Sequence, residues 1–436
     1  MSHTNYLPVN PAVASTKLVK LFKVVLVVLM ALSATVLAQN SKLTASDADA
    51  DDNFGYSLAI SGRTVLVGAW QNDSLRANSG AAYVFELAAD NTWQSTVKLT
   101  PDNADFAGDE FGKAVDIDGD YLVVGAQFDD TVDNDRGAVY IFARTNDAER
   151  PWQQVAKLTA NDSAFRDFFG RTVAISGNYI VVGAPEDDDM GNQSGSAYVF
   201  ELNTTNSTWQ QVAKLTAADG DANDNFGTSV AIDADTVVVG ADEHNHNDIN
   251  NNGAAYVFER DPGTGSWSQT AKLTALDGDA QDEFGTSLAL QDNRLLVGTP
   301  FDDDPDNAGG SVYVFDRSEG TPSWTQTTKL TATDAHLGNQ FGYAVAFTGN
   351  TALIGAPEED TNGNASGAVY VFQQDLSSGA WSQVDKIIAN DSAAFDTFGY
   401  AVAMSDGVAL IGSPEDDDQG EDESGSAYLL SLDVMQ

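Results

Sequence analysis

Acidic side chains recur at three fixed places relative to the short motifs Lys-Leu-Thr, Phe-Gly and Gly-Ala, and their type and spacing suit a chemical role. The first position lies three residues after the Thr of Lys-Leu-Thr, and it holds Asp47, Asp162, Asp219, Asp277, Asp334 and Asp391, with Asn103 in the second copy. The second position lies two residues before the Phe, and it holds Asp52, Asp109, Asp167, Asp224, Asp282 and Asp396, with Asn339 in the sixth copy. The third position lies four residues after the Ala, or after its equivalents Thr299 and Ser413, and it holds Asp73, Asp130, Asp188, Asp303, Asp360 and Asp417, with Asn245 in the fourth copy.

Carboxylates in this pattern suit two roles, and the sequence leaves both open. Asp and Asn side chains close tight turns by accepting hydrogen bonds from backbone N–H groups two or three residues further on. Alternatively, carboxylates from two loops of one unit converge on Ca²⁺, which takes about six to eight oxygen ligands and relieves the repulsion between like charges. The candidate calcium ligands, or turn-forming residues, are Asp47, Asp52, Asp162, Asp167, Asp188, Asp219, Asp224, Asp277, Asp282, Asp303, Asp391, Asp396 and Asp417.

These residues give less support to a catalytic role. The chain has no Cys, and beyond the first 38 residues it has only three His, of which His244 and His246 share one Asn-rich loop. That pair could hold a transition metal, although such pairs in exposed loops are usually only solvated. Paired carboxylates could act as glycosidase acid and base, but only a partly apolar pocket would separate their pKa values. We therefore expect a protein that is not an enzyme.

The elements that position these residues are short strands in a sevenfold repeat. Phe-Gly pairs begin at Phe54, Phe111, Phe169, Phe226, Phe284, Phe341 and Phe398. Each unit has four apolar segments rich in Val, Ile, Tyr and Phe and bounded by Gly, Asp and Asn, a pattern typical of strands. Four-stranded units too small to bury their own faces pack around a ring, so the sequence predicts an all-β, seven-bladed propeller of antiparallel blades in a single domain, residues 39–436.

The two ends of the repeat array predict how the ring closes. The last unit stops near Leu430 without a Lys-Leu-Thr segment, whereas Lys42-Leu43-Thr44 stands alone before the first unit. We expect this N-terminal segment to form the outer strand of the seventh blade.

The seven Phe-Gly pairs, each followed by Gly-Ala-Pro or a variant such as Gly183-Ala184-Pro185, resemble FG-GAP repeat proteins, which include the head propellers of integrin α-subunits. The resemblance covers residues 40–430 and implies a propeller with a binding or adhesive role. Integrin-type repeats carry a D-x-D-x-D-G-x-x-D calcium loop between the first two strands. Here that turn is short, as at Ser176-Gly177-Asn178, so the chain looks more like bacterial FG-GAP proteins.

Two further repeated residues have structural explanations. Lysines occupy the Lys-Leu-Thr position in every unit, which indicates a structural partner on the outer strand and not a catalytic set. Tryptophans stand five residues before the Lys in six units, where they could stack sugars at the rim as in propeller lectins, but such residues more often pack between blades. They are Trp93, Trp152, Trp209, Trp267, Trp324 and Trp381.

The net charge restricts the classes of possible partner, and the N-terminal segment predicts where the protein is located. Lys and Arg number 21 against 65 Asp and Glu, a formal charge of −44, which disfavours nucleic acid and anionic membranes as partners. Lys17, Lys20 and Lys23 precede the apolar run 24–32, and small residues near Ala38 suit signal peptidase, so residues 1–38 are expected to be a cleaved signal peptide with no membrane insertion afterwards. We expect a secreted, extracellular or periplasmic monomer.

These features together predict a non-enzymatic binding or adhesion module. Most acidic residues fall in the loops that join the second to the third strand and one blade to the next, so one face should be strongly negative and should present Ca²⁺-binding loops to a protein or cell-surface ligand. The alternatives are a lectin that binds glycans and, with less support, a glycan-active hydrolase.

Overall fold

The computed structural model describes residues 40–73, 75–102, 107–130, 135–247, 249–303, 309–318, 321, 323–417 and 420–432. Ala38–Gln436 form one compact unit. The expected signal peptide, residues 1–38, lies outside the described residues. Within those residues no helix has the length and apolar character needed to cross a membrane.

The described strands form seven four-stranded antiparallel sheets, as the sequence predicts. The first three blades are β2 (Phe54–Ser61), β3 (Thr64–Ala69), β4 (Ala81–Leu87) and β5 (Trp93–Leu99); β6 (Ala114–Asp118), β7 (Tyr121–Ala126), β8 (Ala138–Arg144) and β9 (Trp152–Leu158); and β10 (Thr172–Ser176), β11 (Tyr179–Ala184), β12 (Ser196–Asn203) and β13 (Thr208–Leu215). Each sheet is a meander whose neighbours in space are neighbours in sequence.

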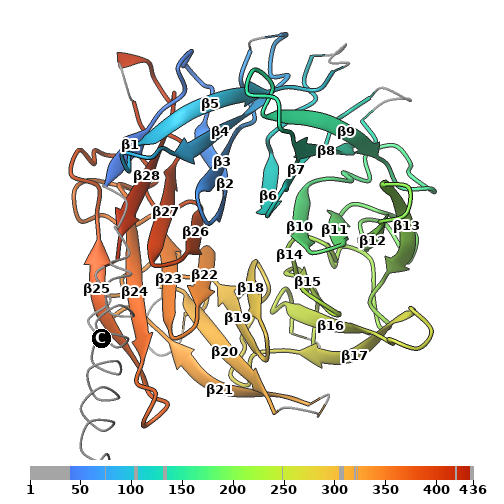
Figure 1. Ribbon diagram of the computed structural model, residues 1–436. Coiled ribbons are helices and arrows are strands. Elements are labelled where there is room, and N and C mark those ends of the chain that lie inside the picture. The colour runs from blue at the N-terminus through green and yellow to red at the C-terminus, as the bar shows by residue number, and fades with distance from the viewer. Residues whose placement is uncertain are drawn as a thin grey trace, which may run out of the picture. The chain divides into compact units, whose positions relative to one another are not determined.

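The next three blades repeat this order. They are β14 (Val230–Asp233), β15 (Thr236–Ala241), β16 (Ala254–Arg260) and β17 (Trp267–Leu273); β18 (Ser287–Gln291), β19 (Arg294–Thr299), β20 (Ser311–Arg317) and β21 (Trp324–Leu330); and β22 (Ala344–Thr348), β23 (Thr351–Ala356), β24 (Ala368–Gln374) and β25 (Trp381–Ile387). In Figure 1 the first strand of each blade lies near the centre of the ring and the fourth lies at the rim.

The seventh blade joins the two ends of the described chain. It contains β26 (Val402–Ser405), β27 (Val408–Ser413), β28 (Ser426–Ser431) and, at its outer edge, β1 (Ser41–Leu43). Lys42 of β1 is paired with Tyr428 of β28. The predicted closure of the ring by the N-terminal strand is therefore confirmed.

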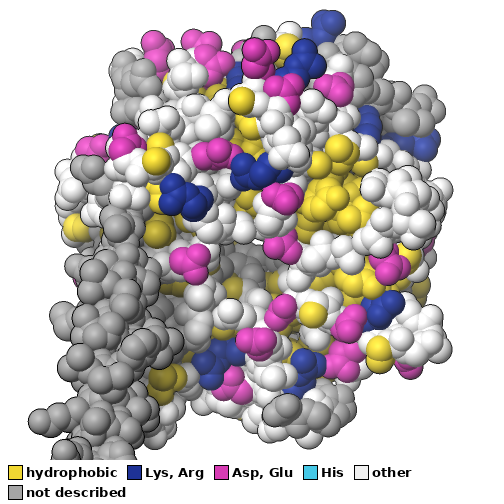
Figure 2. Space-filling model, viewed as in Figure 1, with side chains coloured by type: hydrophobic (Ala, Val, Ile, Leu, Met, Phe, Trp, Pro, Cys, Tyr) yellow, Lys and Arg dark blue, Asp and Glu magenta, His cyan; other side chains and the backbone are white. Residues whose placement is uncertain are grey.

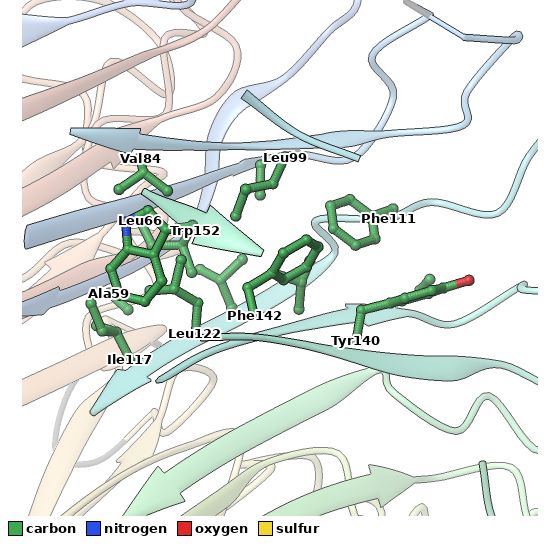
Figure 3. Packing of buried hydrophobic residues seen from close by; sticks show 14 of the residues in the cluster. Ala59, Leu66, Val84, Leu99, Phe111, Ile117, Leu122, Tyr140, Phe142 and Trp152 are labelled. Carbon is green, nitrogen blue, oxygen red and sulfur yellow. The ribbon is translucent and has the colours of Figure 1, made fainter. Parts of the chain in front are cut away.

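The core consists of apolar layers between adjacent blades. The second strand of each blade is almost wholly buried because its side chains contact a neighbouring blade on both faces, and this explains its unbroken run of Val, Leu and Ile. Figure 3 shows one such layer, in which Leu66 and Val84 of the first blade meet Leu122, Phe142 and Trp152 of the second.

Glycine is required where neighbouring blades approach each other. Gly112 has a φ of 95°, and a Cβ built on it would lie 2.3 Å from the carbonyl oxygen of Ala81 in the preceding blade. The Phe-Gly motif therefore allows close backbone contact between blades. The Phe of the same motif is fully buried in every blade.

Candidate functional site

The three recurring Asp positions all lie on one side of the ring, which we call the loop face: the loops that join second to third strands and one blade to the next. First-position carboxylates form ion pairs with the lysine on the outer strand of the same blade. The pairs are Lys98 with Asp47 (2.7 Å), Lys214 with Asp162 (2.8 Å), Lys272 with Asp219 (2.7 Å), Lys329 with Asp277 (2.9 Å), Lys386 with Asp334 (2.7 Å) and Lys42 with Asp391 (2.8 Å). The repeated lysines, for which the sequence indicates a structural role on the outer strand, thus form ion pairs with acidic groups.

A fourth polar position completes each cluster. It lies three residues after the Ala of Gly-Ala, one residue before the third position, and its side chain is buried. The Nζ atom of Lys214 lies 2.9 Å from Asp187 at this position, and the Tyr198 hydroxyl donates to the same carboxylate at 2.6 Å. The equivalent residues are Asn72, Asp129, Asp187, His244, Asp302, Glu359 and Asp416. We call the lysine, the tyrosine and the first- and fourth-position residues of one blade its blade cluster.

In the blade cluster, charge pairing affects the pKa values more strongly than burial does. Burial lowers the pKa of Lys214, but the hydrogen bonds that its ammonium group donates to Asp162, Asp189 and Asp187 outweigh that effect and raise the pKa above the usual lysine range. Likewise, burial raises the pKa of Asp162, but the hydrogen bond and charge of Lys214 hold it below the usual range. The first-position carboxylates are therefore ionised partners of a charged lysine at neutral pH.

Second-position carboxylates have a different environment, because they are buried and accept backbone hydrogen bonds. The Asp282 carboxylate accepts the N–H of Asp279 at 2.6 Å, and the Asp224 carboxylate accepts that of Asp221 at 2.7 Å. Burial raises the pKa of Asp282 to about 7 and that of Asp167 to about 6. These groups brace the loop that enters each blade, which agrees with a turn-forming role.

Third-position side chains close the loop after the second strand. Asp188 accepts the backbone N–H of Gln193 at 2.8 Å, and Asp417 accepts that of Glu423 at 3.0 Å. Asn245 accepts the N–H of Asn251 at 2.7 Å in the same way, which explains why Asn replaces Asp there. Asp303 lies at the edge of a gap in the described residues.

Calcium fits this arrangement only in part. The lysine already neutralises the first-position carboxylates, and the described residues contain no group of three or more His, Cys, Asp or Glu arranged to hold a metal ion. The second position leaves more room for a cation, because the Oδ1 atoms of Asp109 and Asp224 are buried without a hydrogen-bond partner. Any calcium would therefore use the second-position carboxylates and not the first-position ones.

The fourth blade departs from the others in one residue. His244 occupies the fourth position, where its Nδ1 lies 2.8 Å from Asp224 and its Nε2 lies 2.7 Å from Nζ of Lys272. An ammonium group only donates, so Nε2 accepts and Nδ1 carries the proton toward Asp224. Both ring nitrogens of His244 are thus engaged in hydrogen bonds inside the protein, and His246 takes no part in this arrangement.

The mouth of the central channel is where the blades differ most. The residue after each Phe-Gly lines a hollow of about 320 Å³ between the innermost strands. These seven residues, which we call the channel ring, are Tyr56, Lys113, Arg171, Thr228, Thr286, Tyr343 and Tyr400. The propeller as a whole is also hollow near its centre in the space-filling view (Figure 2).

One side of the channel ring is aromatic and cationic. Tyr400 lies between Tyr56 and Tyr343, with each pair of ring centroids 4.9 Å apart. Nζ of Lys113 lies 3.4 Å from the centroid of Trp70 and 4.4 Å from that of Tyr56. These contacts are cation–π interactions, which hold the ammonium group over the aromatic rings.

The other side is polar. Arg171 is exposed and donates to Gln127 at 3.2 Å, and Thr228 donates to Asp242 at 3.2 Å. Burial raises the pKa of Asp242 to about 6 and, together with the charges of Asp242 and Glu243, that of Glu283 to about 7.

The repeated tryptophans pack between blades and present no stacking platform at the rim. Trp152 is 4% exposed and lies in the layer between the first two blades. The indole N–H groups of Trp93, Trp152, Trp267, Trp324 and Trp381 are buried without an acceptor. A sugar-binding role at the rim is not supported by these positions.

Sequence reasoning missed the fourth position and the channel ring. The fourth position is next to the third in an acidic run of the sequence. Only its contact with lysine in the structure distinguishes its role from that of the third position. The channel ring had a signal that could have found it: the residue after Phe-Gly varies in size and charge, whereas the Gly before it is constant and the residue after it is always small, Ser, Ala or Thr.

Comparison with solved structures finds similar chains at low sequence identity. A Lactobacillus plantarum protein covers 78% of this chain and 85% of its own, with 11% identity and a TM-score of 0.51. A periplasmic gluconolactonase from Pseudomonas aeruginosa covers 77% and 86%, with 14% identity and a TM-score of 0.51. Sqt1 from Saccharomyces cerevisiae covers 91% and 100%, with 10% identity and a TM-score of 0.48. At these identities the likeness concerns the fold alone.

The comparison with curated proteins found no match. The family model described as FG-GAP repeat matches seven times, at residues 37–85, 93–142, 152–200, 209–258, 267–315, 324–372 and 381–430. These matches cover every blade, including the N-terminal strand that closes the ring. The chain therefore belongs to the FG-GAP repeat family.

Proposed function

We propose that this FG-GAP propeller is an exported, non-catalytic binding module whose ligand contacts the channel ring on the loop face. The observation that carries the proposal is the asymmetry of the channel ring. Fold requirements act equally on all seven blades, so they favour the same residue at each equivalent position. The ring instead combines Tyr56, Lys113, Arg171 and Thr228 in adjacent blades, which suits an asymmetric ligand.

A binding role is favoured over catalysis because, in the described part of the chain, carboxyls with raised pKa values are not confined to one pair. Asp167 and Asp282 brace loops in different blades, and Asp242 and Glu283 beside the channel ring have raised pKa values as well. The channel ring supplies hydroxyl, aromatic and guanidinium groups, which bind polar ligands by hydrogen bonds and ring stacking. A glycan is one ligand with matching chemistry, and a protein loop is the other.

The test uses substitutions that the fold already tolerates. Arg171→Thr and Tyr343→Thr introduce the residue that blades four and five carry at the same place, and Arg63→Gln on the opposite side of the ring is the matched control. A glycan array and a display of extended peptides, each run with calcium and with chelator, should yield ligands that the wild type and Arg63→Gln bind. The two Thr variants should bind them at least about tenfold more weakly. Equal binding by all variants, or turnover of an arrayed glycan, would contradict the proposal.

Calcium is proposed as an accessory to this function. Its ligands would include the second-position carboxylates Asp52, Asp167, Asp282 and Asp396, whose pKa values burial raises, and Asp224, whose Oδ1 atom is buried without a hydrogen-bond partner. A bound cation would fix the loops around the channel. The sequence-based expectation of a signal peptide at residues 1–38 supports the proposed export.

A further inference from the structure

The layers between blades contain a repeated aromatic slot. In six of the seven layers a tryptophan on an outer strand packs against the preceding blade. Trp381, for example, contacts the layer formed by Val314 and Leu330 of the fifth blade and Phe372 of the sixth. The six tryptophans are Trp93, Trp152, Trp209, Trp267, Trp324 and Trp381.

The layer between blades six and seven differs. Its described residues include Val371, Ile387, Leu430 and Leu432 but no tryptophan. The outer strand of blade seven is β1, whose described part begins at Ser41 and lies after the tryptophan position of the repeat. The slot that the other six layers fill with an indole therefore has no indole among the described residues of this layer.

A cavity of about 470 Å³ lies at this place. Its walls include Thr351, Val371 and Ile387 of blade six and Leu430 and Leu432 of blade seven. Leu430 stands where the other six blades carry a larger phenylalanine, as at Phe372, so the slot is also wider at that point. Shape and apolar lining both suit a planar aromatic ring.

The lining also carries a charge that the other slots lack. Asp385 lines the cavity and is paired with Val371 in the register of β24 and β25. The residues at the same register position in blades one to five are uncharged: Val97, Ala156, Ala213, Ala271 and Thr328. Asp385 is exposed, and its Oδ1 accepts the backbone N–H of Lys386 at 2.8 Å.

We propose that this slot is a binding site for a small aromatic amine of indole size. The aromatic ring would take the place that tryptophan has in the other six layers, and the ammonium group would lie against Asp385. The strongly negative charge of the chain favours a cationic ligand over a neutral or anionic one of the same shape. This site lies between blades six and seven and is independent of the channel ring.

Three probes with one ring and different charge test the proposal: tryptamine, indole and indole-3-acetate, titrated calorimetrically into the full-length chain at neutral pH. Tryptamine should bind most tightly and indole-3-acetate most weakly. An exposed ion pair contributes at most about 1 kcal/mol, so tryptamine should exceed indole by up to about fivefold. Absence of binding, or equal binding of all three probes, would overturn the proposal.

Two variants locate the site. Asp385→Ala introduces the residue of blades two, three and four, and it should make tryptamine and indole bind equally. Trp267→Ala opens the equivalent slot between blades three and four, where Ala213 of blade three stands in place of the acid, so it should add a second site without charge preference. If Trp267→Ala fails to fold, Asp385→Ala still decides, because an unchanged preference for tryptamine in that variant would overturn the assignment to this slot.

Discussion

The ammonium group of Lys42 lies 2.8 Å from the carboxylate of Asp391, although 349 positions separate the two residues in sequence. The ion pair closes the seventh blade together with the backbone pairing of Lys42 and Tyr428. Lys42 also lies 2.8 Å from the largely buried carboxylate of Asp416. The two ends of the propeller are thus held by a strand ladder and by charge at one place.

Deletion of residues 39–45 should destabilise the whole ring. The change removes β1 and Lys42, so it exposes an edge of β28 and leaves Asp416 without its cation. We expect a loss of several kcal/mol, on the order of the roughly 3–5 kcal/mol found when one partner of a buried ion pair is removed. Thermal unfolding followed by circular dichroism measures the effect, and an unchanged melting temperature would contradict closure by β1.

Lysine substitutions should differ in cost according to the fourth-position residue. Lys214→Met leaves the buried carboxylate of Asp187 unpaired, whereas Lys98→Met leaves the neutral amide of Asn72. We expect Lys214→Met to lower the free energy of unfolding by about 3 kcal/mol and Lys98→Met by about 1 kcal/mol. Urea denaturation of both variants checks the order, and equal losses would show that the fourth-position charge does not matter.

Calcium should stabilise the protein more than sodium does at matched ionic strength. Sodium only screens the repulsion among carboxylates, whereas a site held at 100 times its dissociation constant adds about 2.7 kcal/mol. Melting curves in the two salts give the comparison, with Asp282→Asn as the variant and Asp188→Asn, which keeps the turn acceptor, as its control. Asp282→Asn should lose part of the calcium increment. Coincident curves for the wild type would leave the recurring Asp residues with turn formation alone.

Asp116 should make stability depend on pH. It stands in β6 where the other six blades carry Ala, and it accepts the N–H of Ile175 at 2.7 Å from the next blade. Burial raises its pKa to about 7, above the value of about 3.9 expected for the unfolded chain. The folded state therefore binds more protons in this range, and the contribution of Asp116 to stability falls as pH rises from about 4 to about 7.

Asp116→Ala should remove that part of the pH dependence. Melting temperatures of wild type and variant are measured between pH 5 and pH 7.5. They should converge toward pH 5, and the variant should have the higher melting temperature toward pH 7.5. Ala231, which occupies the same place in blade four, offers the reverse test: Ala231→Asp should add a pH-dependent loss. Parallel profiles for wild type and Asp116→Ala would contradict the assignment.

The fold could be predicted almost completely from the sequence because seven copies of one pattern reinforce each other. Short apolar runs such as Ala254–Arg260, bounded by Gly and Asp, predicted the strands, and the isolated Lys42-Leu43-Thr44 predicted the closure. The site could be predicted less well. The spacing of Asp162 and Asp188 in the chain does not show that the first binds a lysine and the second caps a loop, because this depends on which side chains meet across strands.

In each blade the residue after Phe-Gly lines the channel mouth together with the two residues that follow it, while the preceding Phe and Gly are fixed by packing and by close backbone contact. Under the proposed function, a single-residue exchange such as Arg171→Thr changes the surface that one blade presents to the ligand, and it removes the hydrogen bond to Gln127 of the preceding blade. Under the proposed function, the seven residues that follow Phe-Gly set the ligand specificity, and exchanges at these positions would change the ligand while the blades stay the same.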